Sequence, residues 1–189
     1  MEKPKVKLVF LDRDGVINKY PGDFKYVTRV DEFQLLPGVK TALEKLTSSG
    51  FRLFVVSNQA GVSKGLYSRQ DLEDMDKKML GELGEKVKFS GIFYCPHRAD
   101  ENCLCRKPKI GLLNKVFSDL RNQGLEIDFP NSYFIGDSMV DMETGEAAGL
   151  KTILVFSGRE TPRNQLHWIR IPDYKADDLS SAAQIIISS

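Results

Sequence analysis

Two acidic residues, Asp12 and Asp14, stand one residue apart directly after the apolar run 8–11. A run of this kind is typical of a buried parallel strand, and open α/β sheets place their ligand sites at the carboxyl ends of strands. Two carboxylates held close together repel each other unless a cation or a shared proton offsets their charge. The glycine that follows, Gly15, allows the chain to turn sharply. By itself, the pattern also fits an ordinary turn at the end of a strand.

Three further polar clusters occupy comparable places in the sequence. They are Ser57-Asn58-Gln59 after the run 51–56, Arg106-Lys107-Pro108 after a cysteine-rich segment, and Gly136-Asp137-Ser138, with Asp141, after the run 133–135. Each cluster alone fits a polar turn, a solvated basic loop or a helix cap. Together they place acids, a hydroxyl group and a lysine at successive strand ends, so we expect them to meet in one crevice.

This set of groups matches what phosphoryl transfer requires. Hydrolysis of phosphate monoesters is among the slowest uncatalysed reactions, and enzymes accelerate it by up to ~10²¹-fold. Asp12 can attack phosphorus and form an aspartyl phosphate, which divides one difficult step into two. Asp14 can protonate the leaving oxygen and later take a proton from the attacking water. Ser57 and Lys107 can bind the phosphoryl oxygens, because positioning and charge neutralisation dominate this chemistry.

A magnesium ion fits the same residues. Mg²⁺ prefers hard oxygen ligands, and Asp12 and Asp137 can each supply a carboxylate oxygen. Asp141 can then fix Lys107 or a water molecule bound to the metal. The residues alone therefore predict a magnesium-dependent phosphoryl-transfer enzyme.

A second metal site is predicted by the cysteines, all of which lie within residues 95–105. The candidate ligands are Cys95, His97, Cys103 and Cys105. Three clustered cysteines argue against a disulfide framework, and three thiolates with one imidazole form a closed tetrahedral set for structural zinc. Four protein ligands leave no position for a catalytic water. We expect zinc to fold this loop and to deliver Arg106 and Lys107, which follow the last ligand directly.

The elements that must position these residues alternate along the chain. We expect strands at 7–11, 52–57, 91–94, 132–135 and 152–156, and helices at 39–49, 69–87, 112–123, 140–148 and 179–187. Ser68 and Asp71 have the spacing of a capping box for the second helix, whose apolar residues Leu72, Met75, Met79 and Leu83 recur at helical spacing. This alternation predicts an α/β fold with a doubly wound, mostly parallel sheet and helices on both faces. We expect one domain over residues 1–189, with the zinc loop 95–105 inserted.

Composition agrees with a globular enzyme. The chain has 189 residues, of which 41% are hydrophobic and 28% charged, and its net charge is +1. This balance gives no electrostatic reason to expect nucleic acid or a membrane as a partner. No apolar run approaches the ~18 residues of a transmembrane helix, and we expect no secretory signal and a cytoplasmic monomer. We interpret His167 and Trp168 as structural residues.

The four clusters, in this order, resemble the motifs of the haloacid dehalogenase superfamily. The spacing from Asp12 to Ser57 and from Ser57 to Lys107 leaves no room for a large cap domain, so the chain resembles a capless member. The resemblance implies that the backbone carbonyl of Asp14 completes the protein ligands of Mg²⁺. It also implies substrate contacts, and the residues concerned are Asn58, Gln59, Lys64 and Arg106.

A narrower resemblance covers residues 7–187. The segments 10–18, 57–62 and 95–108 are similar to those of the phosphatases that remove the 7-phosphate of D-glycero-D-manno-heptose 1,7-bisphosphate in lipopolysaccharide precursor synthesis, and to those of the related histidinol-phosphate phosphatases. Lys64 departs from the heptose pattern, which has arginine there, and lysine lacks the planar fork that binds a phosphate bidentately.

We favour the heptose over histidinol phosphate because 16–18 and 65–67 follow its pattern. A bisphosphate also gives Arg106 and Lys64 a second phosphate to bind. Two other classes stay open from the residues alone. One is a zinc-stabilised binding module without catalysis, against which every expected catalytic position is filled. The other is a phosphatase of nucleic-acid ends, for which the sequence lacks a basic stripe with interleaved aromatic residues.

Overall fold

Six parallel strands form the central sheet of the computed structural model, which describes residues 3–189. Their order in space is β4-β3-β2-β6-β7-β8, and every neighbouring pair is parallel. The strands are β2 (Leu8–Leu11), β3 (Arg52–Asn58), β4 (Phe89–Cys95), β6 (Tyr133–Gly136), β7 (Lys151–Val155) and β8 (Tyr174–Ala176). A separate parallel pair joins β1 (Lys5–Val6) to β5 (Glu126–Ile127). The predicted parallel α/β sheet is confirmed.

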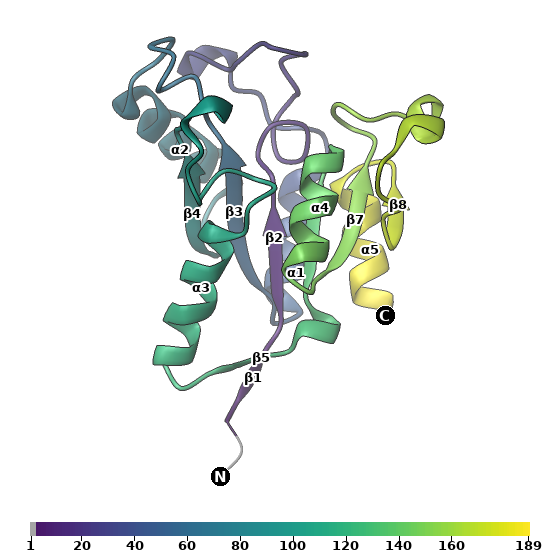
Figure 1. The fold of residues 1–189 in the computed structure, drawn as a ribbon. Coiled ribbons are helices and arrows are strands. Elements are labelled where there is room, and N and C mark those ends of the chain that lie inside the picture. Colours follow the sequence, from purple (N-terminus) through teal and green to yellow (C-terminus); the bar gives the residue numbers. More distant parts are fainter. Residues whose placement is uncertain (1–2) are drawn as a thin grey trace.

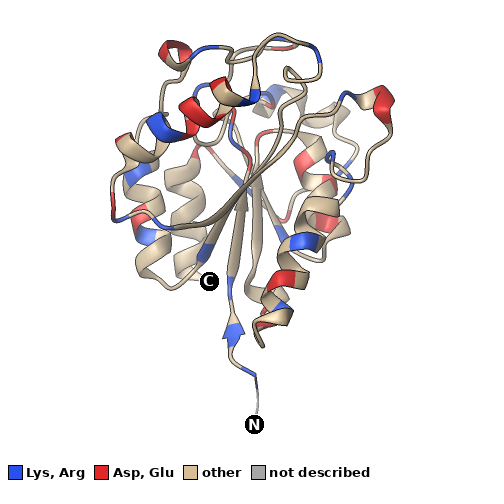
Figure 2. Ribbon diagram, turned by 90° about the vertical axis from the view of Figure 1, so that its left-hand side faces the viewer, with Lys and Arg blue, Asp and Glu red and all other residues tan. Residues whose placement is uncertain are grey.

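Helices cover both faces of this sheet, as expected (Figures 1 and 2). They are α1 (Val39–Ser48), α2 (Arg69–Leu83), α3 (Gly111–Asn122), α4 (Met139–Ala147) and α5 (Leu179–Ser188). Apolar side chains of α1, α2 and α5 share one core with the sheet. Those of α3, and the residues directly after α4, belong to the core on the other face.

The central strand β2 is buried on both sides, which explains its unbroken apolar sequence. Val9 and Leu11 point into the first core, and Leu8 and Phe10 into the second. The ring of Phe10 stacks on that of Phe54, with centroids 5.3 Å apart. Such packing fixes the strand that ends at the two acidic residues.

The strand order places the site. The chain passes from β2 to β3 on one side, and it later returns to pair β6 with the other side of β2. Ligands of doubly wound sheets bind at this reversal, outside the carboxyl ends of the strands. The loops at these ends gather at one end of the molecule, opposite the N-terminus (Figure 1).

Several element bounds differ from those expected. The helix expected at 69–87 ends at Leu83, because Gly84 has a φ of 74° and turns the chain out of the helix. Its predicted capping box is confirmed. The sequence analysis missed β1, β5 and β8, which have only two or three residues each and give no readable alternation.

No cap domain covers the strand ends in the described part of the chain. The long segment between β2 and α1 contains turns, two isolated β-bridges and one short 3₁₀ helix, Val30–Glu32, but no further domain. The shorter segment between β3 and α2 contains turns alone. Residues 3–189 include no helix that is both long and apolar enough to cross a membrane.

Candidate active site

A cavity of about 200 Å³ opens at the carboxyl ends of β2, β3 and β6. Eight predicted residues line it: Asp12, Asp14, Ser57, Asn58, Arg106, Lys107, Asp137 and Asp141. They come from all four polar clusters of the sequence. The structure therefore brings the clusters together in one crevice, as their positions at strand ends suggested.

Lys107 connects two of the acidic residues. Its Nζ lies 2.6 Å from Oδ1 of Asp141 and 3.1 Å from Oδ1 of Asp12. The lysine is 4% exposed. Burial favours its neutral form, but the two carboxylates outweigh burial and raise the pKa of Lys107 above its ordinary value. The ammonium group therefore keeps its charge inside the protein, next to the candidate nucleophile.

Burial raises the pKa of Asp12 to about 6. The Lys107 ammonium and the Ser57 hydroxyl oppose this shift, whereas the charges of Asp141 and Asp14 add to it. Burial likewise raises the pKa of Asp137 well above its usual range, and the carboxylates of Asp141 and Asp12 raise it further. Besides this effect of burial, the clustered carboxylates leave the site with more negative charge than Lys107 balances.

A divalent cation fits this imbalance. Oxygens of Asp12, Asp137 and Asp141 lie within 4.8 Å of one another, and Lys107 supplies one positive charge against their three negative ones. Both oxygens of Asp141 are engaged, by Lys107 and by Ser138. The hydrogen bonds found within residues 3–189 engage only Oδ1 of Asp12 and Oδ2 of Asp137. The second oxygen of each is left for a hard cation such as Mg²⁺.

Two glycines make room for Asp137. A Cβ atom on Gly15 would lie 2.2 Å from Oδ2 of Asp137, and one on Gly158 would lie 2.0 Å from the same atom. Gly15 also has a φ of 87°, which favours glycine. The glycine after Asp14 therefore serves the turn and also allows Asp137 to approach β2.

Asp141 has a structural task besides holding Lys107. Ser138 is the N-cap of α4, and its Oγ donates to Oδ2 of Asp141 at 2.6 Å while its backbone N–H donates to the same oxygen at 3.2 Å. The spacing from Asp137 to Asp141 thus combines a strand end with a capping box. The cap fixes one oxygen of Asp141 and presents the other to Lys107.

Asp14 is held by donors on both oxygens. Its Oδ1 accepts from Nη2 of Arg13 at 3.0 Å and from Nδ2 of Asn18 at 2.8 Å. Its Oδ2 accepts from Nε2 of Gln59 at 2.9 Å. Arg13 is fully buried, and its guanidinium lies over the rings of Phe33 and Tyr94. The second predicted acid therefore reaches the cavity wall as an anchored carboxylate.

Two residues expected to touch substrate lie away from the cavity wall. Gln59 is 1% exposed, and both ends of its amide bind protein groups, so it supports Asp14 and does not face a ligand. Lys64 is exposed, and its Nζ lies over the ring of Tyr26 at 5.2 Å. The family resemblance implied that both residues contact the substrate. It did not indicate that Gln59 is buried or that Lys64 lies over Tyr26.

The four candidate zinc ligands lie together: Cys95 ends β4, and the other three are in the loop that follows. Sulfur–sulfur distances among the three cysteines are 3.3 to 3.6 Å, and Nδ1 of His97 lies 3.2 Å from Sγ of Cys105. A tetrahedron with zinc–sulfur bonds of about 2.3 Å has edges of roughly 3.8 Å. The cluster therefore has nearly the size that zinc needs, and its donor set suits that metal. Nη1 of Arg106 donates to the backbone oxygen of His97 at 3.1 Å, which ties the arginine to the same loop.

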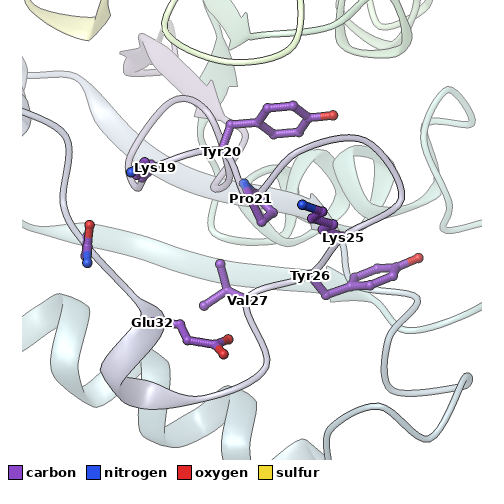
Figure 3. Close-up of a pocket in the computed structure, with 8 residues that line it drawn as sticks. Lys19, Tyr20, Pro21, Lys25, Tyr26, Val27 and Glu32 are labelled. Atoms are coloured by element: carbon purple, nitrogen blue, oxygen red, sulfur yellow. The ribbon is translucent and has the colours of Figure 1, made fainter.

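Sequence reasoning missed part of the cavity wall. Tyr20, Pro21 and Tyr26 come from the segment after β2, and Arg159 comes from the loop after β7. These loops have no periodicity that predicts where they fold. Tyr20, Pro21 and Tyr26 also line a neighbouring cavity of about 350 Å³, where the two tyrosine rings extend toward the same side (Figure 3). The neighbouring cavity is larger but lacks the carboxylate cluster, so we place the chemistry in the smaller one.

Comparisons with known proteins agree with this geometry. A sequence profile of the family described as polynucleotide kinase 3 phosphatase matches residues 7–183. D-glycero-D-manno-heptose-1,7-bisphosphate 7-phosphatase of Chlorobaculum tepidum is 38% identical over 185 residues, which cover 93% of this chain and 92% of the relative.

Solved structures agree as well. The crystal structure of D,D-heptose 1,7-bisphosphate phosphatase from B. bronchiseptica, complexed with magnesium and phosphate, is 31% identical, has a TM-score of 0.84, and is matched over 97% of this chain and 99% of its own. A HAD-like phosphatase from Mesorhizobium loti is 26% identical with a TM-score of 0.75, over 98% of this chain and 86% of its own. The chain belongs to the haloacid dehalogenase superfamily.

As a member of this superfamily, the protein is a phosphoric monoester hydrolase, and it is similar to heptose bisphosphate phosphatases. The expectation of a non-catalytic binding module does not agree with these findings. Trp168 packs on Phe156 and donates to Glu160, while His167 is exposed, so neither belongs to the site.

Proposed function

We propose that this phosphatase removes the 7-phosphate of D-glycero-D-manno-heptose 1,7-bisphosphate through an aspartyl-phosphate intermediate, with Mg²⁺ as cofactor. The observation that carries the proposal is the position of Lys107 between Asp12 and Asp141, beside Asp137. An ammonium group and a site for a divalent cation flank one carboxylate at the end of β2. Such an arrangement would neutralise the charge of a phosphoryl group bound next to the Asp12 carboxylate.

In the first step, a carboxylate oxygen of Asp12 attacks phosphorus, and the bond from phosphorus to the sugar oxygen breaks. Asp14 gives its proton to that leaving oxygen, so the sugar departs as an alcohol. Lys107 and the Ser57 hydroxyl bind the phosphoryl oxygens, whose negative charge spreads as the bonds change. Because Asp14 rests among donors, it must turn from Arg13 toward the cavity to perform this transfer.

In the second step, water attacks the phosphorus of the aspartyl phosphate. Asp14 takes a proton from the water, the bond between phosphorus and Asp12 breaks, and inorganic phosphate leaves. Both acidic residues then return to their starting forms. One aspartate is thus the nucleophile and the other is the acid and base.

The fit of the residues supports Mg²⁺. The free oxygens of Asp12 and Asp137 would hold the ion, and the backbone carbonyl of Asp14 is the third ligand that we propose. The ion would supply charge neutralisation at the phosphoryl group. The related B. bronchiseptica structure contains magnesium and phosphate. We propose Zn²⁺ as a structural ion at the other cluster, whose four ligands leave no open position.

Two arginines at the cavity wall support a substrate with a second phosphate. Arg106 and Arg159 both line the cavity, whereas the predicted partner Lys64 does not. A guanidinium group binds phosphate through two parallel hydrogen bonds. Histidinol phosphate, the alternative that the sequence left open, has only one phosphate and would leave one arginine without a phosphate partner.

The test is phosphate release from a panel of substrates. We expect release from one or both anomers of the heptose 1,7-bisphosphate, with kcat/KM at least about tenfold above that for histidinol phosphate. A 3′-phosphorylated oligonucleotide belongs in the panel because of the name of the matching family. The net charge of +1 gives no electrostatic reason to expect an oligonucleotide as the substrate. Release from the oligonucleotide alone would overturn the proposal.

Three further expectations remain proposals. They are a single domain over residues 1–189, a monomer and a cytoplasmic location. Size-exclusion chromatography with light scattering tests the monomer directly.

A further inference from the structure

The buried Gln59 links the two halves of the site. Its Nε2 donates to Oδ2 of Asp14 at 2.9 Å and to Oγ of Ser57 at 3.2 Å. Its Oε1 accepts from the Tyr67 hydroxyl at 2.5 Å and from Nη2 of Arg13 at 3.3 Å. Every hydrogen-bonding position of this amide is therefore used inside the protein.

The direction of these hydrogen bonds is fixed by chemistry. Arg13 can only donate, so the atom of Gln59 that it meets must be the carbonyl oxygen. Burial raises the pKa of the Tyr67 hydroxyl above its ordinary value, so this hydroxyl keeps its proton and donates to the same oxygen. The NH₂ end of Gln59 must then face Asp14 and Ser57. Two donors on one side thus set the orientation of the amide.

This orientation dictates where the Ser57 hydroxyl can donate. A hydroxyl has one proton, and Oγ of Ser57 already accepts from Gln59. Its proton must therefore point away from Gln59. Ser57 and Asp12 both line the cavity, so this proton is free to donate into the cavity. A phosphoryl oxygen bound beside Asp12 would meet the same proton.

We propose that Gln59, oriented by Tyr67, is a positioning residue that aims the Ser57 hydroxyl at the phosphoryl group and holds the Asp14 carboxylate between turnovers. The inference rests on the proposed roles of Ser57 and Asp14. It assigns to Gln59 a task that needs no contact with substrate, in agreement with its burial. One amide then couples the group that binds phosphate to the group that moves the proton.

Two variants test this inference. Gln59→Glu keeps the shape but replaces the NH₂ donor with an oxygen, which faces the carboxylate of Asp14. We expect kcat to fall about 100-fold on a sugar phosphate, and by a smaller factor on p-nitrophenyl phosphate, whose leaving group needs little protonation. Tyr67→Phe keeps the ring and frees the amide to turn over, so we expect kcat to fall about three- to tenfold. For both variants KM should change less than about threefold.

A matched control is Tyr133→Phe, which removes a hydroxyl from another buried tyrosine of the same core. It should leave kcat and the ratio between the two substrates unchanged. The inference is overturned if Gln59→Glu keeps kcat within about twofold of wild type, or if its losses are equal on both substrates and match its loss of thermal stability. If Gln59→Glu does not fold, the same criteria apply to Tyr67→Phe.

The assay also separates this inference from the proposed function. If the wild-type enzyme fails to hydrolyse the heptose bisphosphate, the proposed substrate is wrong. The comparison of variants then continues with p-nitrophenyl phosphate and with whichever sugar phosphate the enzyme accepts.

Discussion

Asn58 and Lys107 bind each other reciprocally, although 49 residues separate them. Nδ2 of Asn58 donates to the backbone oxygen of Lys107 at 3.1 Å, and the backbone N–H of Lys107 donates to Oδ1 of Asn58 at 3.0 Å. This pair joins the end of β3 to the segment that directly follows the four residues that we propose as zinc ligands. Asn58 therefore holds the backbone of Lys107 from the side of the sheet, and we propose that zinc in the loop holds it from the other side.

The first prediction concerns the nucleophile. Asp12→Asn keeps the shape of the side chain and removes its attacking charge, so turnover should fall by at least about 10³-fold. Because the substitution also relieves charge repulsion with Asp137, the melting temperature of the metal-free protein should not fall. Phosphate release and thermal unfolding measure both quantities. Turnover close to that of wild type would exclude the covalent mechanism.

The second prediction concerns proton transfer. Asp14→Asn cannot protonate the leaving oxygen, so turnover of a sugar phosphate should fall by about 10²- to 10⁴-fold. An aryl phosphate with an activated leaving group should lose much less. The two rates are measured side by side on the same preparation. Equal losses on both substrates would argue against Asp14 as the acid.

The third prediction concerns magnesium and pH. The raised pKa values of Asp12 and Asp137 mean that the folded metal-free protein holds protons which the unfolded chain has released. Its stability should therefore fall as pH rises from about 4 through 6. Mg²⁺ favours the ionised carboxylates, so it should raise the melting temperature more at pH 8 than at pH 5. Thermal unfolding with and without Mg²⁺ at the two pH values measures this difference.

A variant controls for binding elsewhere on the protein. Asp137→Asn removes one proposed ligand, so it should raise the Mg²⁺ concentration for half-maximal activity at least about tenfold. It should also reduce the rise in melting temperature that Mg²⁺ causes at pH 8. If Mg²⁺ raises the melting temperature of the variant as much as that of the wild type, the ion binds at another site.

Much of this site could be predicted from the sequence because its residues follow buried strands. Asp12 and Asp137 come directly after β2 and at the end of β6, and parallel strands bring their carboxyl ends to one edge. The cluster that we propose for zinc could be predicted because its four residues are close in sequence. In both cases, the local pattern and the global fold demand the same placement.

The roles of Gln59 and Arg159 could not be predicted in this way. Gln59 is buried beside Tyr67, which comes from the far end of the same loop and donates to it, and a motif does not show which side of the strand end is covered. Arg159 arrives on a loop whose path is set by Gly158 against Asp137. The end of α2 was misplaced because Val87 continues the apolar spacing beyond Gly84 and is itself buried.

The fourth prediction concerns the second phosphate. Nε of Arg159 lies 3.2 Å from Oδ1 of Asp23, which also accepts from the Tyr20 hydroxyl at 2.6 Å. The carboxylate of Asp23 thus pairs with the same guanidinium group that we expect a phosphate to bind, so the two compete for it. Arg159→Gln should raise KM for the bisphosphate about three- to tenfold, a modest factor because the side chain is half exposed. Asp23→Asn should lower KM for the bisphosphate.

Neither substitution should change KM for p-nitrophenyl phosphate, which has no second phosphate. Steady-state kinetics on the two substrates make the comparison. Equal changes on both substrates would assign Arg159 to the reacting phosphate or to the general stability of the loop.

The fifth prediction separates the metal loop from the sheet. Elemental analysis should find about one zinc per chain, since the cluster forms one closed four-ligand site. Cys103→Ser should lower the zinc content and free the loop, so that Arg106 and Lys107 leave the cavity. Activity should then fall at least about 100-fold even with saturating Mg²⁺. The far-ultraviolet circular dichroism should stay close to that of wild type, because the strands and the α-helices lie outside residues 96–107, which contain only one short 3₁₀ helix, Ala99–Glu101.

Asn58 provides the matched comparison for this experiment. Asn58→Leu removes the reciprocal hydrogen bonds to Lys107 but leaves every zinc ligand in place. If both the Asn58 hydrogen bonds and the zinc loop are needed to hold Lys107, Asn58→Leu should lose activity as Cys103→Ser does. It should nevertheless retain its full zinc content. If the bonds from Asn58 alone hold the lysine, a zinc-free preparation will keep full activity, and zinc does not organise the active site. Measured zinc content and phosphate release on the two variants decide between these cases.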